Sequence, residues 1–364
     1  MKQVVKLNLK FGQLNDIMSY PFSIFFTIFF LLMSNVHAQK NEQTKESILY
    51  YFCSPDSAFV GVKDQLGNII IPATYRAGFN YDFKHPITDP VIEFQDTDVQ
   101  PKRKDSPAIP IGDVYSREGK FLYHAQFFDN GLDYYSEGFR RYVDGDKIGF
   151  ADKYGNKVIP AQWNFATPFH YGYSRVYTGK WTRKYDKSDE HWTVVPDAPD
   201  TDIHMINVKG EKVSPLAKQQ NPKDYFSDGN YYPYPFSYTA KEQKIADQLN
   251  SLEVLGLIAR LRFSDEQQDT PRLQFEITEW PTSRFPYYTL QGYQNQRAED
   301  DYIFTVSEDG KNIFHYSFFI TEEQKSLQKW IVSELEECKK YIRNHPNAPY
   351  RFDVKKHLKE WKNK

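Results

Sequence analysis

An internal repeat is the feature that most constrains what this chain can fold into. Residues 61–75 (GVKDQLGNIIIPATY) and 149–163 (GFADKYGNKVIPAQW) align without a gap and are identical at seven of fifteen positions. The likeness extends beyond a turn, because a Pro, an Ala and an aromatic residue follow the turn in both stretches. Two weaker copies place their turn glycines at Gly119 and Gly210. Repetition of one unit predicts a fold in which similar units pack on their neighbours.

Each strong copy has the pattern of a strand, a tight turn and a returning strand. The Asp that starts the turn can accept a hydrogen bond from a nearby backbone N–H, and the turn glycine can adopt positive φ. β-branched residues follow, and then a proline, which lacks an N–H and so ends the hydrogen-bond ladder. We therefore assign structural roles in the repeat to Gly61, Asp64, Gly67, Pro72, Gly149, Asp152, Gly155 and Pro160.

A second glycine and strand accompany the unit, since Gly138 and Gly172 align and alternating side chains follow both. One unit is then about three short antiparallel strands. The arrangement resembles the WG-repeat (KWG-repeat) proteins of bacteria, on the residues Ile148–Asp152, Gly155, Asn156, Val158–Pro160, Trp163 and Gly172. The Trp that gives the repeat its name is replaced by Ile148 and Val60. The resemblance spans roughly residues 59–215; it implies a β-repeat architecture, suggests an interaction surface, and carries over no catalytic residue.

Composition agrees with a β-rich soluble chain that does not bind nucleic acid. Tyr and Phe number 27 and 28 among 364 residues, and aromatic residues favour strands. The formal net charge is −2, so no strongly basic domain is present to attract a phosphate backbone. The short basic run 102–104 reads as a solvated loop.

The N-terminus has the pattern of a secretory signal peptide. An apolar run, Phe22–Met33, is followed by small residues at the cleavage spacing, Val36 and Ala38, and is preceded by three lysines, Lys2, Lys6 and Lys10. The run is shorter than the ~20 residues of a comfortable membrane span, although an uncleaved anchor is the alternative. We expect residues 1–38 to be removed, which leaves an exported, periplasmic or secreted chain with no stable membrane span.

The C-terminal part has a different pattern. Thr239 and Glu242 form a capping box at the start of a helix that carries Ile245, Leu249 and Leu252. Strand candidates follow in 272–280 and 301–320, and a second capping box, Thr321 and Gln324, precedes a helix with an apolar stripe that includes Cys338. The expected fold class is a β-rich repeat domain of antiparallel hairpin units followed by a smaller α+β domain. The predicted order is a signal peptide (1–38), a lead-in strand (39–58), the repeat domain (59–225), a Tyr/Pro-rich linker (226–238), the α+β domain (239–345) and a basic tail helix (346–364).

Residues that could carry chemistry are scattered. Cys53 and Cys338 allow one disulfide in an exported chain, and a free core Cys338 is the alternative. The nine His residues show no metal-ligand spacing, and the acidic stretch Asp197–Asp202 lacks the glycine and the terminal Glu of a calcium loop. We therefore assign no catalytic, cofactor or metal residue, and expect no cofactor.

Three functional hypotheses remain. The favoured one is an exported, non-catalytic protein whose repeats bind an unknown protein or cell-envelope ligand. The second is an exported hydrolase acting on envelope material, with carboxylates drawn from Asp98, Glu276 and Glu279. The third is an immunity-type binder that protects against a toxin in the envelope, for which a toxin-like neighbouring reading frame would be the discriminator.

Overall fold

The computed structural model describes residues 47–78, 81–96, 111–128, 131–187, 192–262, 273–316 and 324–364. The expected signal peptide, Asp98 and the basic run 102–104 lie outside these residues. The chain separates into a unit that ends at Ile48 and a unit from Leu49 to Lys364, to which every element below belongs. None of the helices in the described ranges is long and apolar enough to cross a membrane.

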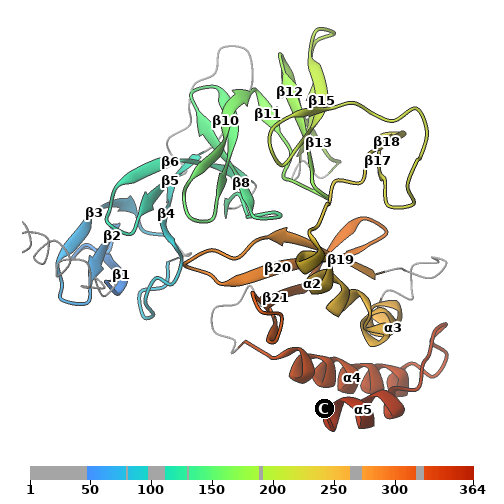
Figure 1. The fold of residues 1–364 in the computed structure, drawn as a ribbon. Helices are drawn as coiled ribbons and strands as arrows, with labels where there is room; N and C mark the ends of the chain where they lie inside the picture. Colours follow the sequence, from blue (N-terminus) through green and yellow to red (C-terminus); the bar gives the residue numbers. More distant parts are fainter. Residues whose placement is uncertain are drawn as a thin grey trace, which may run out of the picture. The chain divides into compact units, whose positions relative to one another are not determined.

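The repeat region is built from short antiparallel strands (Figure 1). The strands are β1 (Leu49–Cys53), β2 (Phe59–Asp64), β3 (Ile69–Arg76), β4 (Val91–Asp96), β5 (Ile111–Ser116), β6 (Phe121–Phe128), β7 (Gly131–Leu132), β8 (Phe139–Asp144), β9 (Lys147–Asp152), β10 (Lys157–Trp163), β11 (Phe165–Ala166), β12 (Tyr173–Thr178), β13 (Trp181–Tyr185), β14 (Trp192–Pro196), β15 (Asp202–Asn207), β16 (Lys212–Val213), β17 (Tyr225–Ser227) and β18 (Asn230–Tyr232).

These strands form three main sheets. The first has the order β1-β2-β3, the second β10-β9-β8-β6-β5-β4 with β7 beside β6, and the third β11-β12-β15-β16. β13–β14 and β17–β18 are separate hairpins. The four turn glycines of the repeat lie in the turns of β2–β3, β5–β6, β9–β10 and β15–β16, so the two weak copies are hairpins like the two strong ones.

Successive hairpins stack through their turn glycines. All three later glycines have positive φ, and a side chain there would strike the preceding hairpin. A Cβ would lie 2.8 Å from the Ile70 carbonyl at Gly119, 2.4 Å from Leu122 at Gly155 and 2.8 Å from Ile159 at Gly210. Each contacted residue lies three or four positions after the turn glycine of its own hairpin. The positive φ favours glycine at all three positions, and at Gly119 the contacted atom is also a backbone oxygen, which cannot move aside cheaply.

The first glycine of each strong copy, Gly61 or Gly149, is required for a different reason. A Cβ on Gly149 would lie 2.5 Å from the Ile159 carbonyl oxygen and 2.6 Å from the Ala161 nitrogen, because β10 bulges across it. Gly61 lies in the same way against the backbone of Ile71–Ala73. The bulge contains Pro160 in the third repeat and Pro72 in the first, where the missing N–H costs no ladder bond.

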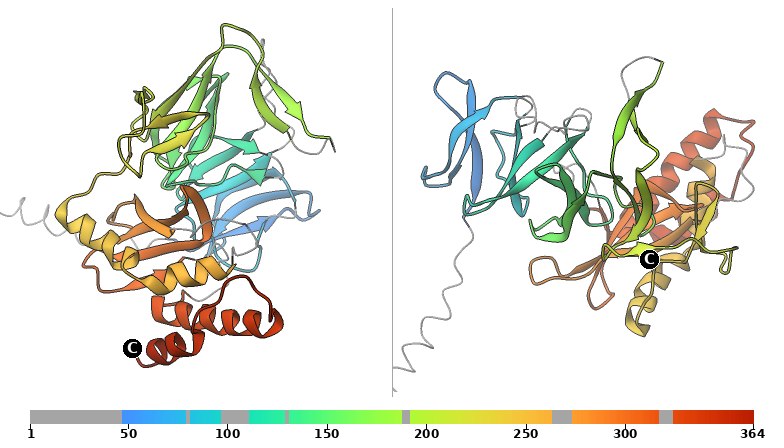
Figure 2. Two further views of the ribbon diagram at one scale, coloured as in Figure 1. Left: turned by 90° about the vertical axis from the view of Figure 1, so that its right-hand side faces the viewer. Right: turned by 90° about the horizontal axis from the view of Figure 1, so that it is seen from above.

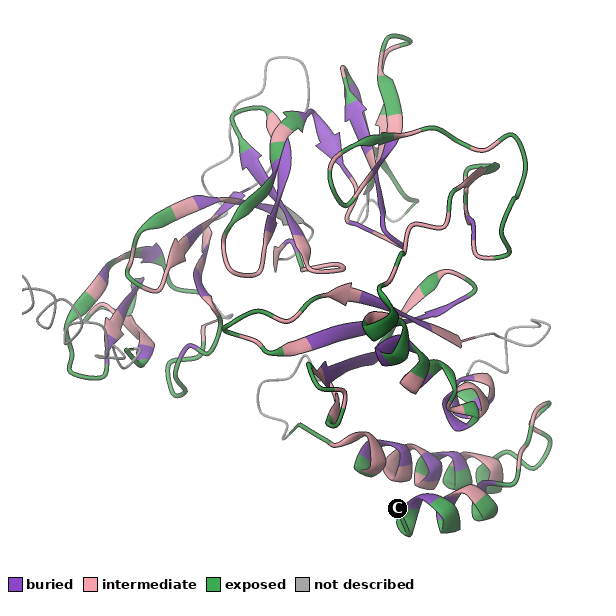
Figure 3. Ribbon diagram, in the orientation of Figure 1, coloured by how far each residue is buried: buried purple, intermediate pink, exposed green. Residues whose placement is uncertain are grey.

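The strands of the repeat region differ in how they contribute to the core, since β9 is buried along most of its length while buried and exposed residues alternate more nearly in β10 (Figure 3). In β9, Ile148, Phe150 and Ala151 are fully buried, and in β10 Ile159 and Trp163 are buried while Pro160 is exposed. Three hydrophobic clusters follow one another along the sheets, in keeping with an array in which each unit contacts its neighbours.

The C-terminal part is a sheet covered by helices (Figure 1, Figure 2). Its antiparallel sheet has the order β19-β20-β21-β22, and one large hydrophobic cluster joins the sheet to the four helices of the described C-terminal residues. The elements are α2 (Ala240–Asn250), α3 (Glu253–Arg262), β19 (Leu273–Glu279), β20 (Tyr287–Gln294), β21 (Arg297–Ser307), β22 (Ile313–His315), α4 (Leu327–Asn344) and α5 (Val354–Lys362). The chain is thus a β-rich repeat structure followed by a smaller α+β part.

The helix signals in the sequence were partly right. Thr239 and Glu242 form the predicted capping box of α2. The second predicted box does not cap α4: the helix begins at Leu327, and the Ser326 hydroxyl accepts the hydrogen bond from the Lys329 N–H. Thr321 lies outside the described residues. A second helix, α3, also follows α2 after a break at Ser251, where the cap N–H turns back to the Asp247 and Leu249 carbonyls.

Candidate functional site

The Asp residues of the repeat turns are engaged in local hydrogen bonds. Asp152 Oδ1 accepts from the N–H groups of Tyr154 and Asn156, both at 2.9 Å, and Oδ2 accepts from the Asn156 side chain at 2.8 Å. Asp64 makes the equivalent three bonds to Leu66 and Asn68. These carboxylates stabilise the turns, and both oxygens of each accept a hydrogen bond from within their own hairpin.

The fourth repeat makes the same hydrogen-bond network, but its carboxylate is on the second residue of the pair instead of the first. Asn207 stands in place of the Asp, and its Oδ1 accepts from the N–H groups of Lys209 at 2.9 Å and Glu211 at 3.0 Å. The Asn207 amide then donates to Glu211 Oε2 at 2.8 Å. The acid has therefore moved from the first residue of the pair to the second, and the geometry is kept.

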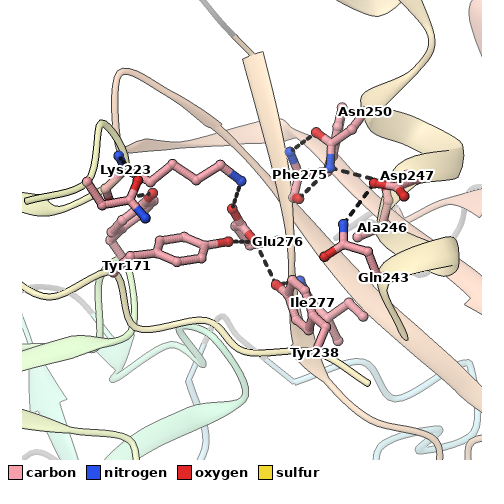
Figure 4. A network of polar contacts seen from close by, with 12 residues as sticks. Tyr171, Lys223, Tyr238, Gln243, Ala246, Asp247, Asn250, Phe275, Glu276 and Ile277 are labelled. Atoms are coloured by element: carbon pink, nitrogen blue, oxygen red, sulfur yellow. Dashed lines mark hydrogen bonds and ion pairs between the residues drawn. The ribbon is translucent and has the colours of Figure 1, made fainter. Parts of the chain in front are cut away.

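Glu276, one of the carboxylates of the hydrolase hypothesis, lies in a network of polar contacts (Figure 4). Its side chain is 1% exposed, and Oε2 accepts from the Tyr234 hydroxyl at 2.7 Å and the Tyr238 hydroxyl at 2.6 Å. Lys223 Nζ lies 3.6 Å from Oε1. Burial raises the pKa of Glu276, against the opposing effect of these hydrogen bonds. The carboxylate fastens the Tyr/Pro-rich stretch to β19.

Glu279, the second of these carboxylates, forms an ion pair with Lys153 of the third repeat turn. Its side chain also packs where a Cβ on Gly138 would lie, 2.9 Å from Glu279 Cγ. Glu276 is thus enclosed, whereas Glu279, whose side chain is 23% exposed, is engaged by the third repeat turn. Asp98, the third member of that set, lies outside the described residues.

Glu137 is a third enclosed carboxylate, and it links two repeats. Its Oε1 accepts from the Tyr171 N–H at 2.5 Å, and its Oε2 accepts from the Gly172 N–H at 2.7 Å. The Tyr293 hydroxyl of β20 also donates to Oε1. Burial raises the pKa of Glu137, although these three donors act in the opposite direction. Glu137 and Gly138 form the central pair of one hairpin turn, and Tyr171 and Gly172 that of the next, all four with positive φ.

One polar cluster opens to the surface instead. His124 Nδ1 lies 2.7 Å from Asp113 Oδ1, and the Tyr75 hydroxyl donates to Asp113 Oδ2 at 2.6 Å. The Tyr115 hydroxyl lies 2.5 Å from that of Tyr75. The Phe121 ring, 42% exposed, lies with its centroid 4.9 Å from the imidazole, whose side chain is 42% exposed. We call these five residues the His124 patch: Tyr75, Asp113, Tyr115, Phe121 and His124.

The hydrogen bonds of the His124 patch determine which imidazole nitrogen is the acceptor. Asp113 is ionised, since its partial burial is outweighed by the hydrogen bonds from His124 and Tyr75, which hold its pKa below the usual value. A carboxylate can only accept, so His124 Nδ1 must carry a proton. The neutral imidazole therefore has its lone pair on Nε2. The patch thus combines an oriented acceptor with an exposed aromatic ring.

The cysteines and the acidic stretch are the remaining candidates. Cys53 and Cys338 do not form the disulfide considered above; both are free, and they belong to different hydrophobic clusters. Burial raises the pKa of the Cys338 thiol to about 11. In the acidic stretch, Asp202 pairs with His204 at 3.0 Å. Within the described ranges, no three His, Cys, Asp or Glu side chains gather as metal ligands would.

Sequence reasoning missed Glu137 and the Asp113–His124 pair. The alignment of Gly138 with Gly172 was available, but it gave no sign that the side chain before Gly138 reaches the next turn. Asp113 and His124 are 11 positions apart and become neighbours only through the β5–β6 register.

Comparison with known families agrees with the repeat. Residues 148–180 match the family model described as WG containing repeat. The chain therefore contains a WG repeat that covers the third hairpin and the strands β11 and β12 after it. No curated protein and no solved structure matches the chain.

Proposed function

We propose that this WG-repeat-containing chain is exported and that its repeat region binds a protein or cell-envelope partner without catalysing a reaction. The observation that carries the proposal is the His124 patch. The carboxylates of the first and third repeat turns, and those of Glu137 and Glu276, are occupied by internal hydrogen bonds. In the His124 patch the imidazole and the Phe121 ring remain accessible instead.

The chemistry of the patch suits recognition. An exposed aromatic ring supplies contact area at a low cost in conformational entropy, and a fixed imidazole acceptor supplies direction. Asp113, Tyr75 and Tyr115 hold that imidazole from behind, which reduces the ordering cost of binding. A partner that offers a hydrogen-bond donor beside an apolar group would fit.

Export supports an envelope setting for the partner, and it can be tested separately. Mass spectrometry of protein recovered from the periplasm or culture fluid should find an N-terminus at Gln39. Retention of residues 1–38 in membrane-bound protein would contradict cleavage and favour the uncleaved anchor, whereas recovery of the protein from the cytoplasm alone would contradict export.

Binding is tested with a photo-crosslinking amino acid placed at Phe121, and with a matched control at Val208. Both side chains are exposed and apolar, at 42% and 43%, but Val208 lies in the fourth repeat turn. We expect a crosslinked species at position 121 that excess unmodified protein competes away, that the Asp113→Asn background weakens, and that is absent at position 208. Equal crosslinking at both positions, or none at 121, would refute the proposed surface.

A further inference from the structure

A cleft under helix α3 lies outside the repeat region and is unrelated to the binding role proposed above. Its volume is about 260 Å³. Apolar side chains from α2, α3 and β19 form most of its wall: Leu249, Leu252, Leu255, Leu257, Leu273 and Phe275. The polar groups at the cleft are Asn250, Glu253, Arg260 and Tyr350.

The cationic group in this wall is available for a ligand. Arg260 places its guanidinium 4.2 Å from the centre of the Tyr350 ring and hydrogen-bonds the Tyr350 side chain. Glu253 also lines the cleft, but among the described residues no carboxylate forms an ion pair with Arg260. By contrast, Arg262, two residues on, pairs with Asp301 and Glu334. Asn250 is not available in the same way, because its side-chain oxygen and nitrogen bond to the Phe275 N–H and carbonyl.

Gly256 is a second feature of the cleft, independent of Arg260. It lies inside α3, where glycine costs about 1 kcal/mol relative to alanine. Its φ is not positive, and a Cβ there would meet no atom of the described chain within 4 Å. Neither backbone conformation nor internal packing therefore requires glycine, and the open space beside it belongs to the cleft. A ligand that lies against the helix backbone would require it.

Gly256 and Arg260 are four residues apart and so share one face of α3. We propose that the cleft binds a small amphipathic carboxylate, with its apolar chain along Gly256 and the leucines and its carboxylate on Arg260. At roughly 30 Å³ per small group, a cleft of this size holds a chain on the order of eight heavy atoms.

Octanoate is the probe that tests this proposal, by calorimetric titration of the intact chain. We expect saturable binding that is at least about tenfold weaker for octanol and for octyltrimethylammonium, because neither can pair with a guanidinium. Arg260→Gln should weaken octanoate binding by about the same factor. Arg343→Gln, an exposed arginine on α4, is the matched control and should leave the affinity unchanged.

Gly256→Leu should abolish octanoate binding by filling the cleft. Gly256→Ala is the milder companion, since a Cβ there meets no described neighbour; it should weaken binding while the melting temperature stays the same or rises. Octanoate that does not bind saturably, or binds Gly256→Ala and Arg260→Gln as tightly as the wild type, would overturn the proposal. Equal affinity for the cationic analogue would do so too, because it would indicate non-specific adsorption.

Discussion

The carboxylate of Glu137 accepts a hydrogen bond from the backbone N–H of Gly172 at 2.7 Å, so a side chain in one repeat holds the turn of the next. The two carboxylate oxygens have separate tasks, because Oε1 receives the Tyr171 N–H and the Tyr293 hydroxyl while Oε2 receives Gly172. Glutamate is thus needed for its two acceptors.

Glu137→Gln should destabilise the protein by roughly 1–3 kcal/mol although it preserves shape, because the amide NH₂ would replace an acceptor that faces a buried N–H. Urea denaturation followed by circular dichroism measures the change. An unchanged free energy of unfolding would show that Glu137 does not couple the two turns.

Glu276→Gln should have the opposite outcome at neutral pH. Both tyrosine hydroxyls donate to Oε2, so one amide oxygen can accept both, and the buried charge is removed. The partner Lys223 is 38% exposed, so its loss of an ion pair costs little. We expect the variant to be at least as stable as wild type.

The pH dependence gives Glu276 a second test. Folding raises the pKa of Glu276. As the pH rises, Glu276 therefore ionises first in the unfolded chain, where its pKa is about 4.3. Wild-type stability therefore falls as the pH passes from about 4.3 up through the folded-state pKa. The advantage of Glu276→Gln over wild type should grow across that window. An advantage that shrinks with rising pH would contradict the sign of this pKa shift.

Asp152→Ala should cost about 1 kcal/mol, as the loss of a local side-chain-to-backbone turn does. The fourth repeat suggests a rescue, since Asn207 and Glu211 make the same network with the acid at the other end. Asp152→Asn combined with Asn156→Glu should recover most of the lost stability. A double variant no more stable than Asp152→Ala would show that the two networks are not interchangeable.

Gly149→Ala should destabilise by more than about 2 kcal/mol, because the new methyl group would overlap backbone atoms that cannot move aside cheaply. Gly78→Ala is the control: a Cβ there meets no described atom within 4 Å, and its effect should stay within about 0.5 kcal/mol. Thermal denaturation of both variants decides the comparison.

Asp113→Asn should change the tautomer of His124. The carboxylate holds the proton on Nδ1, and an amide does so less strongly because it carries no charge. Nitrogen-15 NMR of the imidazole should show Nδ1–H in the neutral wild type and a shift toward Nε2–H in the variant. An Nε2–H tautomer in the wild type would remove the acceptor on which the binding proposal rests.

The sequence predicted those parts of the structure that depend on interactions between residues close together in the chain. The hairpin turns and the capping box at Thr239 depend on side chains two to four positions apart, and such spacings are visible in a sequence. The start of α4 was misplaced because Thr321 and Ser326 offer similar caps, and the Phe314–Ser326 bridge to β22 distinguishes them only in three dimensions.

The candidate sites could not be predicted in the same way. Glu276 was singled out for its acidity, but its role depends on Tyr234 and Tyr238, about 40 positions away, which close over it. Likewise, Gly256 looks like an ordinary weak point in a helix until the space beside it is known. The roles of both residues depend on which distant parts of the chain lie beside them, and a single sequence does not show this.

The stacking of each turn glycine on the hairpin before it gives the array a polarity. Gly119, Gly155 and Gly210 each rest on an earlier unit, whereas a Cβ on Gly67 would meet no described atom within 4 Å. Each internal hairpin therefore makes two different contacts: its turn glycine packs on the hairpin before it, and its return strand is packed on by the turn glycine of the hairpin after it. The same two contacts recur from unit to unit. Repeat units can therefore be gained or lost in evolution while every contact between neighbouring hairpins stays of the same kind.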